Sequence, residues 1–182
     1  MPKAGQCYSG RLLLVIVLAG MLWNGVQAEG ISWDVGAYPR FSAIMYGPEA
    51  DRIVYTEDKS PSYVLTRFVI EGESADDWIE AFEVLDTLRR NVPQTVNEWY
   101  EQFRQQGEQH CPGSEWKVIA QGSDSLTFER RTSDCGSFPE QHALYRVIYG
   151  QHEVFTLTAT RKGSMDDETR SSWLAVLASA KI

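Results

Sequence analysis

Histidine and cysteine are scarce in this sequence, with three of each among 182 residues. A protein metal site needs three or four ligands, and the common zinc motifs place two histidines three or four residues apart. The three histidines, His110, His142 and His152, show no such spacing. The sequence therefore predicts no metal site and no cofactor. Because His142 and His152 flank a predicted strand, both are expected at the surface.

Basic residues are fewer than acidic ones, 17 Lys+Arg against 25 Asp+Glu, which gives a formal net charge of -8. Nucleic acids and anionic membrane surfaces bind basic faces. The charge balance therefore argues against both as partners, and it identifies no other partner by itself.

Motifs of the common enzyme classes are also missing. No glycine-rich phosphate loop and no G-x-S-x-G elbow occurs, so nucleotide binding and serine-hydrolase chemistry lack support. The acidic runs Asp76-Asp77 and Asp166-Asp167-Glu168 stand where helix N-termini favour negative charge, which accounts for them without the paired carboxylates of a glycosidase. We expect no enzymatic activity, and an unrecognised hydrolase is the least favoured alternative.

Long apolar runs are absent except near the N-terminus, where residues 1–28 have the three parts of a secretory signal peptide. Lys3 and Arg11 supply a basic region, Leu12 to Leu22 form a short apolar core, and a small-x-small pattern ends at Ala28. The apolar run is too short to span a bilayer comfortably. We expect cleavage after Ala28 and a periplasmic or secreted protein that meets a membrane only through this leader. A retained single anchor is the alternative.

Export would place the chain in an oxidising compartment. Cys7 would leave with the leader, so the mature chain would keep Cys111 and Cys135, an even number that indicates a disulfide. In the stretch GEQHCPGSEW, His110 precedes Cys111, but adjacent side chains in a turning segment point apart and seldom form a nucleophile and its base. We predict a Cys111–Cys135 bridge with His110 as a polar surface neighbour. A free reactive thiol and a metal site are the alternatives.

No internal repeat and no Pro/Ser linker divides the chain after residue 28. We therefore expect a single α+β domain over residues 51–182, an antiparallel β-sheet covered by helices, preceded by an irregular lead-in over 29–50. Period-two spacing predicts strands, and capping residues with an apolar stripe predict helices. The predicted strands cover residues 51–58, 62–73, 115–122, 125–132, 142–150 and 153–162, and the predicted helices cover 95–107 and 164–182.

Residues 74–90 fit either a helix or a strand. Ser74 and Asp77 resemble a capping box, and apolar residues recur beyond them at helical spacing. The same segment also places large side chains on one face of a half-buried strand: Trp78, Phe82 and Val84. The local pattern slightly favours the helix.

Several segments together resemble a known group of proteins: GESADDWIEAFEVL, CPGSEWKVI, ALYRVIYGQHEVFTLTATRKG, a helix between the first two, a second cysteine and a final helix with Trp and Leu. The group comprises small exported bacterial proteins of unknown function whose domain is similar to the PsbP-like fold, shared with the DcrB family and the Mog-type Ran-binding proteins. The resemblance covers the chain from about residue 50 to the end. It implies an antiparallel sheet sandwiched by helices, a strand over 78–86, and an accessory or binding role without a shared catalytic residue.

Basic and aromatic residues supply the candidates for a binding surface. The segments FERR and ATRK place basic residues near strand ends, where they could hold an anion or a partner's carboxylate, although charged strand ends also keep sheet edges from pairing. Most tryptophans that remain after the leader are expected in the core, and one or two exposed ones would mark a binding surface. The candidate residues are Trp78, Trp99, Arg130, Arg131 and Arg161.

The sequence therefore predicts an exported, non-enzymatic accessory or protein-binding domain whose partner is another envelope protein. The alternative is a small-ligand carrier with a pocket between sheet and helix. A deep apolar cavity lined by Trp78, Trp99 or Phe103 would favour the carrier, and a flat aromatic patch would favour protein contact. The sequence leaves the oligomeric state open.

Overall fold

The structure is a computed structural model, and it describes residues 29–182 except positions 49, 51–54, 75, 134 and 137–138. The predicted signal peptide therefore lies outside the described residues. Within them, no helix is long and apolar enough to cross a membrane.

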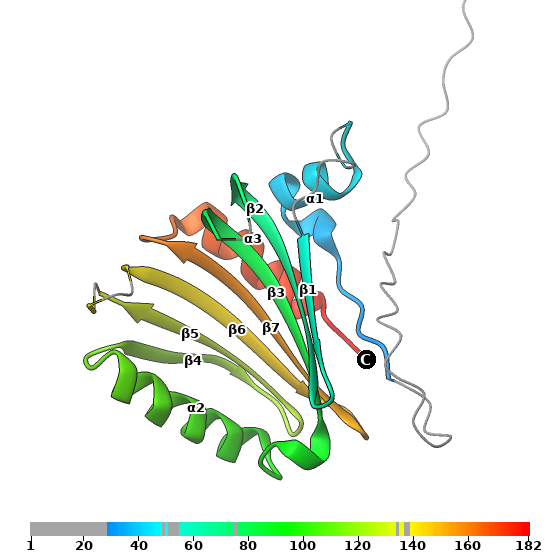
Figure 1. Ribbon diagram of the computed structural model, residues 1–182, viewed down its shortest axis with the longest axis vertical. Coiled ribbons are helices and arrows are strands. Elements are labelled where there is room, and N and C mark those ends of the chain that lie inside the picture. Colours follow the sequence, from blue (N-terminus) through cyan, green and yellow to red (C-terminus); the bar gives the residue numbers. More distant parts are fainter. Residues whose placement is uncertain (1–28, 49, 51–54, 75, 134, 137–138) are drawn as a thin grey trace, which may run out of the picture.

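In the described part of the chain, seven antiparallel strands form one sheet in the order β1-β2-β3-β7-β6-β5-β4 (Figure 1). Consecutive strands pair as neighbours within two meanders, β1 to β3 and β4 to β7. The last strands of the two meanders, β3 and β7, pair with each other and join them. The strands are β1 Tyr55–Ser60, β2 Tyr63–Gly72, β3 Trp78–Leu88, β4 Glu115–Gln121, β5 Ser125–Thr132, β6 Gln141–Tyr149 and β7 Glu153–Lys162.

Helices cover both faces of the sheet, which confirms the predicted α+β class. α2 lies on one face alongside β5 and β6, and α1 and α3 lie on the other (Figure 1). The α-helices of the described residues are α1 Pro39–Tyr46, α2 Val96–His110 and α3 Asp167–Ser179, and short 3-10 turns occupy Val35–Ala37 and Arg89–Asn91.

The larger of two hydrophobic cores fills the space between the sheet and helices α1 and α3. Phe41, Phe82 and Trp173 have no exposed surface, and the rings of Phe82 and Trp173 stack with their centroids 5.4 Å apart. Full burial of an apolar side chain of this size stabilises a fold by about 1.5–3 kcal/mol. The larger core therefore holds α1 and α3 to the sheet.

The segment 29–50 was expected to be irregular, and this expectation was wrong because it contains a 3-10 turn and helix α1. The sequence conceals α1 because the helix has 8 residues, starts with Pro39 and has no capping side chain at Tyr38. Three aromatic residues of this segment, Trp33, Tyr38 and Phe41, lie in the larger core.

Residues 78–88 form strand β3, so the local preference for a helix was wrong and the strand implied by the resemblance is present. The apparent capping box belongs to the turn between β2 and β3. Ser74 Oγ accepts from the Asp77 N–H at 3.0 Å, and the Glu73 N–H donates to the Asp77 carbonyl at 2.9 Å. Pairing with β2 and β7 on its two sides decides the strand against the local pattern.

Helix α2 begins with the predicted capping box, in which Thr95 and Glu98 exchange hydrogen bonds between side chain and backbone. The sequence predicted that the helix ends at Gly107, but it continues to His110. Gly107 is needed inside the helix because a Cβ at that position would lie 2.5 Å from the ring of Trp116. The glycine therefore allows α2 to approach the sheet closely.

The smaller core lies between α2 and the sheet. Phe128 is fully buried at its centre, and its ring stacks on Tyr145 with the centroids 4.7 Å apart. The remaining strands and α3 occupy the segments that the sequence predicted, within a few residues, and positions 51–54 of the first predicted strand lie outside the described residues. Asp166 caps α3 by accepting from the Thr169 N–H at 2.7 Å.

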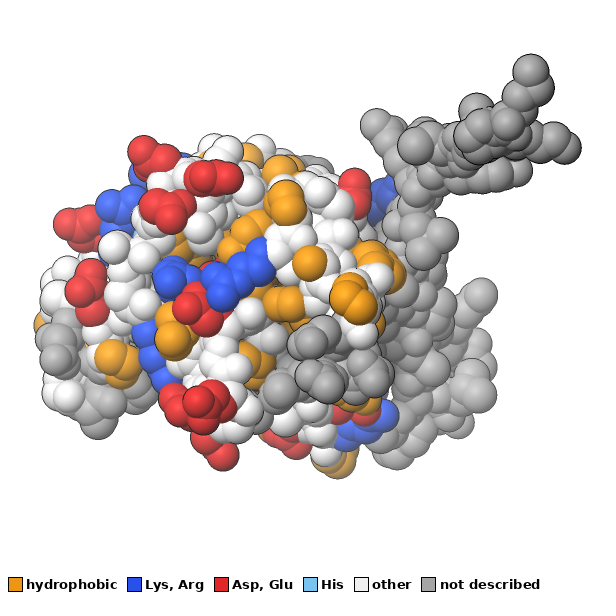
Figure 2. Space-filling view, turned by 90° about the horizontal axis from the view of Figure 1, so that it is seen from above, with side chains coloured by type: hydrophobic (Ala, Val, Ile, Leu, Met, Phe, Trp, Pro, Cys, Tyr) orange, Lys and Arg blue, Asp and Glu red, His pale blue; other side chains and the backbone are white. Residues whose placement is uncertain are grey.

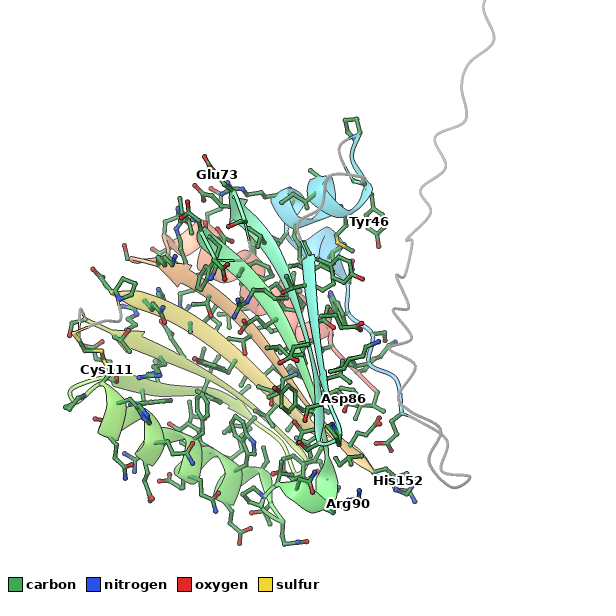
Figure 3. All side chains as sticks on the ribbon, in the orientation of Figure 1. Tyr46, Glu73, Asp86, Arg90, Cys111 and His152 are labelled. Atoms are coloured by element: carbon green, nitrogen blue, oxygen red, sulfur yellow. A yellow bond between two sulfur atoms is a disulfide. The ribbon has the colours of Figure 1, made fainter. Side chains whose placement is uncertain are left out.

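Cys111 and Cys135 form the predicted disulfide, with their Cα atoms 5.6 Å apart. The bridge links the end of α2 to the segment between β5 and β6 (Figure 3). His110 is exposed, as expected, and its Nδ1 lies 2.7 Å from the Gln106 carbonyl oxygen. The imidazole therefore bonds its own helix, and the bridge leaves no thiolate for it to activate.

Reduction of the disulfide should lower the melting temperature. A bridge with a sequence separation of 24 removes unfolded-state entropy worth about 3 kcal/mol, or roughly 6–12 °C in a domain of this size. Thermal unfolding followed by circular dichroism, with and without dithiothreitol, measures the shift. The Cys111→Ser/Cys135→Ser variant should have the melting temperature of the reduced protein, and dithiothreitol should not change it. An unmoved melting curve, with two thiols titrating in the untreated protein, would contradict the bridge.

Candidate binding surface

The five candidate residues lie on both faces of the sheet and form no single surface. Arg130 and Arg131 are neighbours on β5 and therefore point to opposite faces. Trp99 belongs to α2 and packs against the smaller core, and Arg161 lies on the side of the larger core. Trp78 stands at the start of β3. Each residue therefore has its own environment.

Arg130 lies beneath α2 and supports the second half of that helix. Its guanidinium carbon stands 4.8 Å from the Trp116 ring centroid, and one of its nitrogens donates to the Gly107 carbonyl and to Ser114 Oγ, each at 3.3 Å. Arg130 Nε has no hydrogen-bond partner in the described part of the chain. One buried donor of this arginine is therefore unsatisfied.

A pocket of about 300 Å³ opens between α2 and the sheet beside the disulfide. This volume is at the lower end of the range for small-ligand pockets. Neither Trp78 nor Trp99 lines it, and Trp99 instead stacks on Phe103 with the ring centroids 4.9 Å apart. The lining residues are Phe103, Gln106, Gly107, His110, Cys111, Arg130, Thr132, Cys135 and Gln141.

Arg161 is engaged by a buried carboxylate. Glu80 has no exposed surface, and its Oε2 accepts from Arg161 at 2.7 Å. The other oxygen accepts from the Tyr38 hydroxyl at 2.9 Å and the Trp173 indole N–H at 2.7 Å. Burial, together with the Glu80 charge, raises the pKa of Tyr38 to about 12. Arg161 therefore serves the junction of α1, α3 and the sheet, and Glu71 takes a further bond from it at 2.8 Å.

Arg131 belongs to a second buried cluster, centred on Glu129. His142 is 2% exposed, so its expected surface position was wrong. Its Nε2–H donates to Glu129 Oε1 at 2.7 Å, and its Nδ1 accepts from the Met165 N–H at 3.1 Å. Burial lowers the pKa of His142, which keeps the ring neutral. Both ring nitrogens are engaged, so neither can take a proton from a substrate.

The Glu129 carboxylate is held by more than the histidine. Arg170 donates to its Oε2 at 2.5 Å and Arg131 to its Oε1 at 2.9 Å. Burial by itself would raise the pKa of Glu129, but hydrogen bonds from Arg170, Arg131 and His142 outweigh it and lower the pKa to about 2. The pocket of about 520 Å³ beside this cluster mixes both charge signs and gives no surplus of cations for an anion: Glu115, Trp116, Lys117, Glu129, Arg131, Asp167 and Arg170.

The face of the sheet that carries α2 extends beyond that helix over β2, β3 and β7, where its side chains are buried or half-buried. Pairing register places three rows of side chains across β2, β3 and β7 on this face, and we name them the open face: Leu65, Leu85 and Thr156; Arg67, Glu83 and Thr158; Val69, Ala81 and Thr160. The rows continue onto β6, where Val147 and Tyr145 belong to the smaller core under α2. Among the described helices, Figure 1 shows none in front of β2 and β3 on this side.

Trp78 lies at one end of the open face between two cations. The guanidinium carbon of Arg67 stands 5.9 Å, and Lys162 Nζ 4.7 Å, from the centroid of its ring. Arg67 also donates to Glu83 at 2.6 Å, whereas Lys162 makes no ion pair within the described chain. Figure 2, which views the molecule from the end that carries the β2–β3 turn, shows basic side chains gathered beside acidic and hydrophobic ones.

Comparison with known proteins adds no evidence about the site. No family model matches the chain, and no curated protein matches it either. Over residues 29–182 with the gaps given above, no group of three or more His, Cys, Asp or Glu side chains could hold a metal ion. The geometry of the described side chains is therefore what supports a function.

Sequence reasoning missed Arg67, whose guanidinium reaches Trp78 from strand β2, and Glu83, which accepts a hydrogen bond from that guanidinium. It also treated Arg131 and Arg161 as available cations. One signal could have corrected the second error, since an acidic residue inside an apolar strand pattern often marks a buried ion pair. The two residues with that signal are Glu80 and Glu129.

Replacing Glu129 with Gln should destabilise the fold and weaken its sensitivity to acid. The carboxylate is 3% exposed, and its loss leaves buried donors of Arg170 and His142 poorly matched, which costs about 3–5 kcal/mol. Because the pKa of Glu129 is about 2 in the fold against 4.5 ordinarily, its stabilisation is present above pH 4.5 and is lost as the pH falls toward 2. Urea unfolding at neutral and acidic pH measures both effects.

The matched control is Glu101→Gln, which removes an exposed carboxylate paired only with Arg104. This change should alter the free energy of unfolding by less than about 1 kcal/mol. A Glu129→Gln protein that loses as much stability in acid as the wild type would contradict the role assigned to Glu129.

Proposed function

We propose that this protein is an exported, non-enzymatic binding protein of the cell envelope whose open face takes up a segment of another envelope protein. The observation that carries the proposal is the end of the open face, where the half-buried Trp78 ring lies between Arg67 and Lys162. Within the rows, the partly exposed side chains are those of Leu65, Arg67, Glu83 and Leu85. A tryptophan with charge beside it combines a large apolar contact area with polar anchoring, which is typical of residues that dominate protein interfaces.

Lys162 indicates the chemistry of the partner. It is half-buried and lacks a carboxylate partner in the described chain, although the protein has a net charge of -8. A carboxylate of the partner would pair with this ammonium group, and a neighbouring apolar side chain would pack on Trp78. The proposed partner segment is therefore acidic and carries at least one aromatic or aliphatic residue.

Three of the buried ionisable groups, Glu80, Glu129 and His142, support a binding role over catalysis. Both oxygens of Glu80 and both oxygens of Glu129 accept hydrogen bonds from within the fold. His142 uses both of its ring nitrogens in the same way. A general base needs an acceptor that faces the substrate, and these groups do not offer one.

Export and the finer fold assignment belong to the same proposal. The disulfide supports export because such bonds persist mainly in oxidising compartments, and the signal-peptide pattern in residues 1–28 agrees with it. An antiparallel sheet with helices on both faces supports the resemblance to PsbP-like domains. We propose a PsbP-like sandwich on these two grounds.

The second candidate function is that of a small-ligand carrier. The pocket of about 300 Å³ between α2 and the sheet favours it, together with the unpartnered Nε of Arg130 beside that pocket. An arginine donor at the wall of a partly apolar pocket suits a small carboxylate. The open face has no role in this alternative, so the two functions can be separated by experiment.

A photo-crosslinking amino acid at Ile79 should capture the partner, whereas the same amino acid at Val118 should not. Ile79 follows Trp78 and is 41% exposed, and Val118 on the β4 edge is 44% exposed, so the two positions match in accessibility. The full chain is expressed in an exporting bacterium, irradiated in intact cells and analysed by mass spectrometry. One envelope protein, crosslinked through an acidic segment, is expected from Ile79 alone.

Trp78→Ala and Lys162→Glu should each reduce that capture by about tenfold or more, as expected for central interface residues. Lys117→Glu is the matched control, because it makes the same charge change at an exposed position of β4. Equal capture from Ile79 and Val118 would contradict a partner on the open face. Capture of no protein, with a small molecule retained in native mass spectrometry, would favour the carrier.

A further inference from the structure

Two buried carboxylates lie next to each other at one end of the β3–β7 pair. Asp86 is 5% exposed and Glu153 is 7% exposed. Asp86 is paired with Phe155, and Leu88 with Glu153, so alternation places both carboxylates on the same face in diagonal positions. Asp86 lies toward the end of the sheet where His152 also lies (Figure 3). Asp86 Oδ1 and Glu153 Oε2 have no hydrogen-bond partner in the described chain.

These two carboxylates lack the cation that the other buried clusters contain. No Lys or Arg side chain in the described residues pairs with Asp86 or Glu153. Arg89, on the adjoining turn, directs its guanidinium to the Gly150 carbonyl. Burial, followed by the charges of Glu153 and Glu29, raises the pKa of Asp86 to about 7, and burial also raises the pKa of Glu153. The corner is therefore acidic and uncompensated.

Glu29 closes the same corner from the start of the described chain. Its carboxylate accepts from backbone N–H groups of the β6–β7 turn, at 2.7 Å from Gln151 and 3.1 Å from both His152 and Glu153. In return, the backbone N–H of Glu29 donates to the Glu153 carboxyl. Gly150 leaves room for this contact, because a Cβ there would collide with the Glu29 carboxylate. The backbone nitrogen of residue 29 is therefore fixed beside the Glu153 carboxyl.

We infer that this corner is a binding site for the protein's own α-ammonium group, formed when the chain is cleaved between Ala28 and Glu29. Hydrolysis adds one water across that peptide bond. The Ala28 carbonyl leaves as a carboxylate with the leader, and the Glu29 nitrogen, with the proton released, becomes an ammonium group at neutral pH. The site is independent of the open face and of the binding role proposed above.

The donor count supports this assignment. The peptide nitrogen of an uncleaved chain offers one N–H, whereas an ammonium group offers three together with a full positive charge. One donor already serves the Glu153 carboxyl. The two added donors equal the two unpartnered oxygens, Asp86 Oδ1 and Glu153 Oε2. Cleavage at this bond would therefore supply both the charge and the donors that the corner lacks.

Three forms of the protein test the inference: residues 29–182 with a free amine, the same chain acetylated at Glu29, and residues 28–182. Both cores lie between Ile31 and Ala180, so each form contains all of them. At pH 7 the free-amine form should melt about 3–8 °C above the other two, an effect on the scale of one ion pair in a domain of this size. Equal melting temperatures of the three forms would overturn the inference.

The advantage of the free amine should depend on pH in a defined direction. An ion pair raises the folded pKa of the amine above its ordinary value near 8, so the stabilisation is complete below about pH 7.7 and is lost as the pH rises through the folded pKa. The other groups that face this corner are the carboxylates of Glu29, Asp86 and Glu153, the His152 imidazole and the Arg89 guanidinium. Melting curves are recorded at pH 7 and pH 10.5 for the free and acetylated forms. Because these other groups are common to both forms, the difference between the two melting temperatures reports the contribution of the amine alone. An advantage that persists unchanged at the higher pH would contradict the inference.

Glu153→Gln gives a sharper test, because the sign of its effect should depend on the N-terminus. With the free amine it removes an ion-pair partner and should lower the melting temperature. With the acetylated chain it removes an uncompensated buried charge and should raise it. Glu115→Gln, at an exposed position of β4, should leave the melting temperatures of both forms unchanged. The same sign in both forms would overturn the inference.

Two further measurements test the position of the cleavage and the kind of cation that the site binds. Mass spectrometry of the protein isolated from exporting cells should find Glu29 as the first residue, and a different first residue would contradict the inference. Calcium chloride added to the acetylated form should leave its melting temperature unchanged. A rise would identify the corner as a metal-cation site in place of an ammonium site.

Discussion

The pairing of β3 with β7 is the constraint on which the rest of the structure depends. Every other pair of neighbours in the sheet joins strands that are consecutive in the chain, so each can form locally. β3 and β7 are separated in sequence by α2 and three strands, and their pairing must offset the entropy of closing that long loop. The larger core packs across this pair through Phe82 and Leu157. Without the pair, two separate meanders would remain, and the rows of the open face would not exist.

Buried carboxylates lie at both ends of this strand pair, and the two ends differ in whether a cation accompanies them. At one end, Glu80 faces Arg161 at 2.7 Å, and the ion pair fastens the helices of the larger core. At the other end, Asp86 and Glu153 face each other without a cation from the described side chains. A buried charge is costly in a medium of low polarity unless a counterion accompanies it. The first end therefore stabilises the helix layer, and the second end leaves a place for a cation near Glu29.

The elements that the sequence could predict are those with local signals. The capping box at Thr95 and the even number of cysteines after the leader needed no knowledge of distant residues. The local pattern favoured a helix where β3 lies because Glu80 and Asp86 occupy core-facing positions and interrupt the apolar alternation of the strand. His142 was misplaced for a related reason, since Glu129 on the neighbouring strand is what allows its burial. Strand register also separated residues that the sequence had grouped as one surface: Trp78, Trp99, Arg130, Arg131 and Arg161.

Burial distinguishes two places in the described chain where a charge lies inside the fold, or half inside it, without a counterion. Asp86 and Glu153 are almost fully buried, so the cost of removing their charges from water falls on the fold itself whenever no counterion is present. Lys162 is only half-buried over Trp78, so water can still hydrate it and the fold loses little while it is unpaired. A permanent partner from the same chain therefore suits the two carboxylates. A reversible partner from another protein suits the lysine.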